Sequence, residues 1–237
     1  MNQGTYPLAA SMINQINRLD VISNNLANSR TNGFKEDGLS EGSFNNYLKK
    51  AQEQNFTPTN INTVLNTVPK IDTKFIVSEQ GSIVGTGNNL DFALVEKDAF
   101  FKVQNDQGEI LLTRDGSFHS LNGQLVNGSG YTVLSANDDP IGADEGFGTL
   151  VGVAKTDYSN LEKIGNNAYR IKDQNIVENL GDNENSVIQS SLEKSNVNAV
   201  QTMVSLIDAH RRFAQSQKAI ETIGQASKTL VDKLGRT

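Results

Sequence analysis

A stripe of apolar and small side chains near the C-terminus constrains this chain more than any other feature. Over residues 196–234 these side chains recur at steps of three and four, which is typical of a helix with a coiled-coil seam. A second apolar stripe opens the same segment in another phase, so the helix has apolar surface in two directions. The seam comprises Leu206, Ala209, Phe213, Ser216, Ile220, Ile223, Ser227, Leu230 and Leu234, and the second stripe comprises Val197, Val200, Val204 and Ile207.

A second helix is predicted at the other end of the chain, over about residues 5–32. Its apolar positions follow helical steps of four, three, three and four. Gly33 comes directly after the periodic run and is predicted to cap the helix. The apolar positions are Met12, Ile16, Leu19, Ile22 and Leu26.

This N-terminal helix is rich in asparagine, which is a poor helix former because its amide competes for backbone groups. Asn24 and Asn28 are four residues apart and share a face, with Asn25 beside them. Two interpretations stay open. The amides bind neighbouring backbone in a crowded bundle and fix its register, or they lie on a solvated face of a fraying last turn.

The middle of the chain has a different pattern. Short alternating runs such as "AFFKVQNDQGEILLTRDGSF" and "GQLVNGSGYTVL" are interrupted by Gly, Asn and Asp, as expected for antiparallel strands and tight turns. The predicted fold class is α+β, with N- and C-terminal α-helices that flank a β-rich centre. These helices are expected to pair with each other and with neighbouring subunits. The expected segments are 1–34 (N-terminal helix), 35–70 (extended connector), 71–190 (β-rich domain) and 191–237 (C-terminal helix).

The composition excludes several classes of protein. The net charge of −6 argues against a nucleic-acid partner, and the lack of cysteine excludes disulfides and thiol chemistry. No run of 18 apolar residues is present, so no membrane insertion is expected. The first twenty residues lack the basic and apolar regions of a cleaved signal peptide.

The two terminal helices do not match each other in length. At 1.5 Å per residue they would be about 40 Å and about 58 Å long. The shorter helix cannot cover the longer one, nor both of its stripes. We therefore expect neighbouring subunits to supply the remaining contacts, and repeated contacts between different surfaces build rings or helical filaments.

No catalytic, metal or cofactor site is predicted. His119 and His210 are the only histidines, and no metal-binding spacing accompanies them. The Asp115–Gly116 pair is a turn signal between apolar runs. Two alternatives to a structural subunit stay open. One is an enzyme, which would have its site around Arg114, Asp115 and His119. The other is a secreted, adhesin-like coiled-coil protein.

Four blocks of sequence resemble the rod and hook proteins of the bacterial flagellum. They are "LDVISNNLANSRTNGFK", "LDFALVEKDAFFKV", "LLTRDGSFHSLNGQLVNGSGYTV" and "SLEKSNVNAVQTMVSLIDAHRRFAQSQKAI", in the order of that family. The last block is most similar to proximal rod proteins, and distal rod proteins come next. The resemblance implies a structural subunit whose terminal helices pack in the inner wall of a tube, with the β-rich part outside.

The resemblance also implies location and partners. It implies a rod that spans the periplasm, and export by the flagellar type III apparatus without a cleaved signal. The implied partners are other copies, other rod proteins, the hook or distal rod, the surrounding basal-body rings and the export apparatus. Phe44 and Leu48 match an export element of the family. The expected subunit-interface residues are Leu19, Asn24, Asn25, Leu26, Asn28, Leu206, Phe213, Ile220, Ile223, Leu230 and Leu234.

Overall fold

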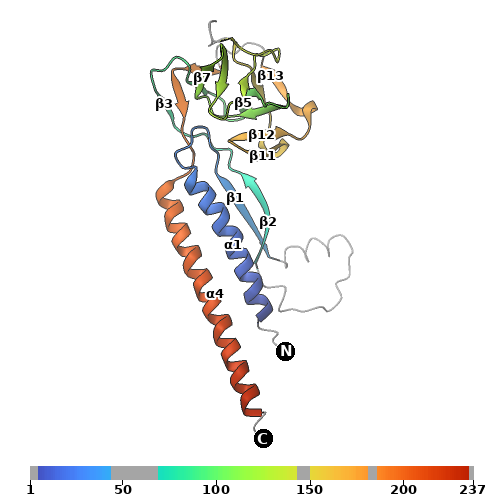
Figure 1. The fold of residues 1–237 in the computed structure, drawn as a ribbon, viewed down its shortest axis with the longest axis vertical. Helices are drawn as coiled ribbons and strands as arrows, with labels where there is room; N and C mark the ends of the chain where they lie inside the picture. Colours follow the sequence, from blue (N-terminus) through green and yellow to red (C-terminus); the bar gives the residue numbers. More distant parts are fainter. Residues whose placement is uncertain (1–4, 44–68, 143–149, 181–185, 235–237) are drawn as a thin grey trace. The chain divides into compact units, whose positions relative to one another are not determined.

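The computed structural model describes residues 5–43, 69–142, 150–180 and 186–234 (Figure 1). The chain forms two compact units. The first, here called the helical unit, takes its described residues from Met1–Leu26, Asp37–Phe75 and Ala199–Thr237. The second, here called the β unit, comprises the described residues of Ala27–Glu36 and Ile76–Asn198. Terminal helices and a β-rich centre confirm the predicted α+β class.

The helical unit contains two long helices, α1 (Thr5–Ala27) and α4 (Ala199–Leu234). Within this unit α1 runs beside the first part of α4 in the opposite direction (Figure 1). With 23 and 36 residues the helices are about 34 Å and about 54 Å long. A two-stranded sheet of β1 (Asp37–Ser43) and β2 (Pro69–Ile76) completes the unit.

The N-terminal helix ends earlier than the periodicity predicts. It stops at Ala27, and residues 28–33 form turns in which the carbonyl of Asn28 accepts from the backbone N–H of Thr31. Gly33 is therefore not the helix cap, although its φ of +66° is left-handed as a cap would require. The reason is local, since the Asn and Ser side chains of this stretch offer the backbone alternatives to helix.

The C-terminal helix also begins later than expected. Val197 precedes α4 and is buried in the β unit, so it does not belong to the second apolar stripe of the helix. The strand β1 lies within the stretch 35–70 that was expected to be an extended connector.

The β unit is built from short antiparallel strands. Its main sheet has the order β11-β12-β6-β5-β9-β8-β7, with β10 joining β5 to β13; β14 pairs with β4, and β15 pairs with β3. The strands are β3 (Ile83–Gly85), β4 (Phe92–Leu94), β5 (Ala99–Gln104), β6 (Ile110–Thr113), β7 (Phe118–Leu121), β8 (Gln124–Asn127), β9 (Thr132–Val133), β10 (Val153–Lys155), β11 (Leu161–Gly165), β12 (Ala168–Ile171), β13 (Glu178–Leu180), β14 (Val187–Gln189) and β15 (Ser191–Glu193).

Turn chemistry and core packing explain this topology. Asn122 and Gly123 both have positive φ and connect β7 to β8, which is the two-residue hairpin turn that an Asn-Gly pair favours. Apolar side chains fill both faces of the central strand β5. Phe101 and Val103 belong to one buried cluster, and Phe100 belongs to the other, together with Tyr158 and Tyr169.

Candidate assembly surfaces and a buried ion cluster

The first three turns of α4 carry a row of exposed apolar side chains, here called the α4 stripe. It comprises Val200, Met203, Val204 and Ile207, and their exposed fractions are 74%, 52%, 57% and 58%. Water is a poor environment for these side chains, so a row of them on one helix is typical of a surface that another element covers. Three of the four residues come from the second apolar stripe of the sequence.

The heptad seam lies differently in the helix. Ala209 is buried, whereas Leu206, Phe213, Ile220 and Ile223 are half-buried. Leu230 is 61% exposed near the end of α4. The side chain of Leu234, the last residue of the helix, lies outside the described part of the structure. Among the described seam residues, coverage is therefore partial as far as Ser227, and Leu230 is exposed.

Asn25 forms the kind of hydrogen bonds to backbone groups that the sequence suggested for Asn24 and Asn28. Its side-chain Nδ2 donates to the carbonyl of Asp37 at 2.9 Å, and its Oδ1 accepts from the Asp37 N–H at 2.9 Å. Asn25 is 3% exposed, and these two bonds fix the start of β1 to the last turn of α1.

The other predicted interface residues of α1 and its following turn vary in exposure. Leu19 and Leu26 are half-buried, and Asn24 is exposed. Asn28 lies in the turn after the helix, where its Oδ1 accepts from the Thr31 hydroxyl. The export candidates Phe44 and Leu48 lie outside the described residues.

A buried ion cluster lies inside the β unit and was not predicted from the sequence. Glu193, at the end of β15, accepts from Lys35 Nζ at 2.7 Å and from Arg114 Nη2 at 2.5 Å. The three side chains are at most 1% exposed. Burial lowers the pKa of Lys35, an effect that the Glu193 carboxylate opposes and the Arg114 guanidinium reinforces. The sequence held only a weak signal, which is that all three residues lie in the blocks that carry the family resemblance.

The residues of the alternative enzyme site do not assemble into one. The Arg114 guanidinium is taken up by Glu193 and by two backbone carbonyls. Asp115 forms the predicted turn, in which its Oδ1 accepts from the N–H and the hydroxyl of Ser117. His119 is exposed on the β7–β8 hairpin. Arg114 and Asp115 are thus bound to structural partners, namely Glu193, backbone carbonyls and the turn residue Ser117.

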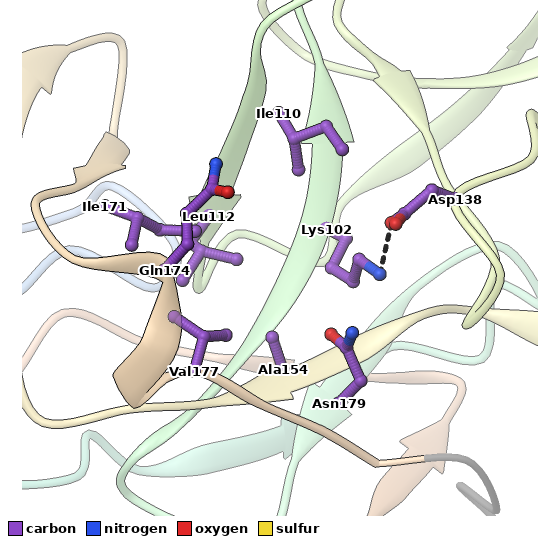
Figure 2. A pocket seen from close by; sticks show the side chains of 9 residues that line it. All are labelled: Lys102, Ile110, Leu112, Asp138, Ala154, Ile171, Gln174, Val177 and Asn179. Atoms are coloured by element: carbon purple, nitrogen blue, oxygen red, sulfur yellow. Dashed lines mark ion pairs between the residues drawn. The ribbon is translucent and has the colours of Figure 1, made fainter.

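A hollow of about 180 Å³ opens on the β unit between β5, β6 and the segment around β13 (Figure 2). Its one lysine, Lys102, is neutralised by Asp138 and also donates to the carbonyl of Ala136. Most of the other lining residues are aliphatic or amide side chains, among them Ile110, Leu112, Ile171, Gln174, Val177 and Asn179. The two ionisable side chains of the lining, Lys102 and Asp138, form an ion pair with each other.

Metal and membrane sites are equally without support. Among the described residues, no three His, Asp or Glu side chains come close enough together to hold a metal ion. No helix in the described part of the chain combines the length and apolarity needed to cross a membrane.

Three family models match the chain. Residues 9–35 match the flagella basal body rod protein model, and residues 94–164 match the D1 domain of the flagellar hook protein FlgE/F/G. Residues 188–232 match the C-terminal model of the flagellar basal body rod FlgEFG proteins. The first and last matches cover most of α1 and α4, and the middle match lies in the β unit.

Individual relatives agree with these models. The chain is 33% identical to flagellar basal-body rod protein FlgG of Buchnera aphidicola from Schizaphis graminum, over 91% of this chain and 93% of the relative. It is 30% identical to rod protein FlgF of Rhizobium meliloti, over 94% of this chain and 99% of the relative. The chain is 34% identical to the hook protein FlgE of Brucella abortus, but only over 57% of this chain and 30% of the hook protein.

The matches reach both terminal helices and the β unit, and they extend over nearly the full length of the FlgG and FlgF relatives. The chain belongs to the FlgF/FlgG family of flagellar basal-body rod proteins.

Proposed function

We propose that this chain is a structural subunit of the flagellar rod that polymerises helically through its terminal helices. The observation that carries the proposal is the α4 stripe, an apolar surface that the rest of the described chain leaves exposed. Family membership supports a rod subunit, and the stripe supports the way in which it assembles.

The energy available from this surface is substantial. Fully burying an aliphatic side chain contributes about 1.5–3 kcal/mol, and the four residues of the α4 stripe are between half and three-quarters exposed. Covering the stripe would therefore contribute about 4–7 kcal/mol per subunit before the costs of association. Leu230 and Val231, at 61% and 68% exposure, offer further apolar surface near the end of α4.

The proposed interface also includes the residues that were expected from the sequence. We assign Leu206, Phe213, Ile220, Ile223 and Leu230 of α4 to it, with Leu234 at the helix end. From the N-terminal side we assign Leu19, Asn24, Leu26 and Asn28. Asn25 supports this surface indirectly, because its own bonds go to the backbone of Asp37.

A proximal position in the rod is proposed from the block "AHRRFAQSQKAI", which resembles proximal rod proteins. Both FlgF and FlgG occur among the relatives at similar identity. Electron cryomicroscopy of purified basal bodies, with mass spectrometry of their contents, would locate the subunit. Density at the end of the rod nearest the hook would contradict a position in the proximal rod.

The proposal includes the surroundings of a rod. We propose that the subunit contacts other rod proteins, the hook or distal rod and the basal-body rings, lies in the part of the flagellum that spans the periplasm, and keeps its N-terminus on export. It has no catalytic role in this proposal. The adhesin alternative gains no support from the relatives, which are flagellar proteins.

Export is proposed to depend on Phe44 and Leu48, which match the export element of the family. A Phe44→Ala, Leu48→Ala double variant should accumulate in the cytoplasm and be missing from basal bodies. Immunoblots of cytoplasmic and basal-body fractions measure this directly. Normal incorporation of the variant would remove the role.

The assembly surface is tested by Val204→Asp. Val204 is 57% exposed, so the charge should leave the single chain folded but prevent burial of the α4 stripe in a polymer. Gln217→Asp, at an exposed polar position of the same helix, is the matched control. We expect Val204→Asp to abolish rod completion and swimming while Gln217→Asp retains both. Normal motility of the Val204→Asp variant would refute the proposed interface.

A further inference from the structure

One carboxylate, that of Glu193, joins three separate parts of the β unit. Its Oε1 accepts from Lys35 Nζ at 2.7 Å and from the N–H of Gly81 at 2.9 Å. Its Oε2 accepts from Arg114 Nε at 2.9 Å and Nη2 at 2.5 Å. Both oxygens are thus saturated by charged and backbone donors in a site that water does not reach.

The backbone around Glu193 binds the segment that follows α1. We call residues 32–36 the entry segment and residues 193–196 the exit segment. The N–H of Gly33 donates to the carbonyl of Glu193 at 2.8 Å, and the N–H of Glu36 donates to Asn196 Oδ1 at 2.7 Å. Lys194 Nζ donates to Asn32 Oδ1 at 3.0 Å. The two segments, about 160 residues apart in sequence, are therefore bonded to each other directly.

Both segments also bind the remainder of the β unit. Arg114 Nη1 donates to the carbonyls of Glu96 and Ala99, each at 2.6 Å. The entry segment passes so close to Arg114 that a Cβ on Gly33 would lie 2.4 Å from the Arg114 carbonyl group. Lys35 Nζ donates to the carbonyl of Glu79 at 2.8 Å. The cluster is tightly packed as well as ionic.

The charges make the cluster depend on Glu193. It contains two cations and one anion, and Glu193 is the anion that both cations contact. Without it, Lys35 and Arg114 would be two like charges buried near each other, and removing the partner of a buried charge is strongly destabilising. Burying Lys35 of the entry segment as a cation therefore depends on the carboxylate that the exit segment supplies.

We propose that Glu193 is a charge lock that keeps the entry segment docked on the β unit only while the exit segment is docked. The segment that follows α1 and the segment that precedes α4 then leave or join the β unit together. This coupling lies within one chain and does not depend on the proposed polymerisation.

Amide hydrogen exchange of the full-length chain tests the lock. Glu193→Gln keeps the shape and removes the charge, and Glu178→Gln, at an exposed position of β13 in the same unit, is the control. We expect Glu193→Gln to speed exchange at least tenfold in peptides that cover residues 30–36 and 191–197, with no such change in the control. Wild-type exchange of residues 30–36 in Glu193→Gln would overturn the proposal.

A double variant separates charge from packing. Lys35→Met should lower the denaturation midpoint of the wild-type chain but raise that of Glu193→Gln, because there it removes one of two unpaired cations. If Glu193→Gln does not fold alone, the folded fraction of the double variant is the readout, and recovery of folding supports the lock. A lower midpoint in both backgrounds, or no recovery, contradicts it.

Discussion

At the scale of single residues, buried polar side chains connect parts of this protein that apolar packing alone would not hold in register. Asn25 binds the start of β1, and Arg114 and Lys35 bind Glu193 across the β unit. Each is satisfied by specific partners, which is the condition under which buried polar groups are tolerated. Replacing any of these buried side chains should therefore lower the stability of the fold more than replacing an exposed polar side chain does.

Replacing Asn25 by Ala should destabilise the helical unit by about 1–3 kcal/mol, because two backbone groups of Asp37 lose their partners. Asn17→Ala, at an exposed position of the same helix, is the control and should have little effect. Far-UV circular dichroism during urea unfolding measures the loss. Equal midpoints for the two variants would show that the Asn25 bonds contribute nothing.

Asp115 should make the stability of the β unit depend on pH. Burial raises the pKa of its carboxyl, and the hydrogen bonds from Ser117 oppose this only in part. The folded state then binds the proton more tightly than the unfolded state, so stability is lost as pH rises from about 4 through the raised pKa. Asp115→Asn keeps an acceptor for Ser117 and cannot titrate.

The melting temperatures of the two proteins between pH 4 and pH 7 check this expectation. The wild type should lose stability relative to Asp115→Asn as the pH rises. Parallel curves over the whole range would contradict it.

At the scale of elements, the helices and strands predicted from the sequence are those that local patterns determine. Periodicity identified α1 and α4, and the short alternating runs interrupted by Gly, Asn and Asp identified the antiparallel strands of the centre. The end of α1 was predicted too late, because the competition between helix and Asn side chains over residues 24–32 is weak and depends on tertiary contacts. The ion cluster escaped prediction because Lys35, Arg114 and Glu193 are brought together only by the tertiary fold.

Close packing beside the pair of β3 and β15 requires a glycine at position 81 but not at position 85. A Cβ on Gly81 would lie 1.8 Å from the carbonyl oxygen of Lys194, whereas a Cβ on Gly85 would find its nearest neighbour at 3.9 Å. Gly81→Ala should therefore separate the strands and destabilise the β unit by about 1–3 kcal/mol or more. Gly85→Ala should be nearly neutral.

Thermal unfolding of the two glycine variants measures the difference. A melting temperature of Gly81→Ala as high as that of Gly85→Ala would show that the backbone near Lys194 moves aside easily. In that case the packing around the exit segment would be looser than the contacts of Glu193 indicate.

At the scale of the whole molecule, the chain divides its tasks between two compact units. The β unit contains the two apolar core clusters described above and pairs the charges of its buried ion cluster internally. The helical unit leaves the α4 stripe exposed, although apolar side chains at four positions of one helix would be costly on an isolated molecule. Because the chain belongs to the FlgF/FlgG family of rod proteins, we propose that neighbouring subunits cover this surface.

The most direct test of this account measures whether the α4 stripe is covered in the assembled rod. The chain has no cysteine, so Val204→Cys introduces a single thiol at a position that is 57% exposed in the single chain. A maleimide reagent should label this thiol fully in the purified monomer and in denatured basal bodies from motile cells. In intact basal bodies from the same cells the labelling should fall at least tenfold. Equal labelling of the intact basal bodies and the monomer would show that the stripe stays exposed, and assembly through α4 would be wrong.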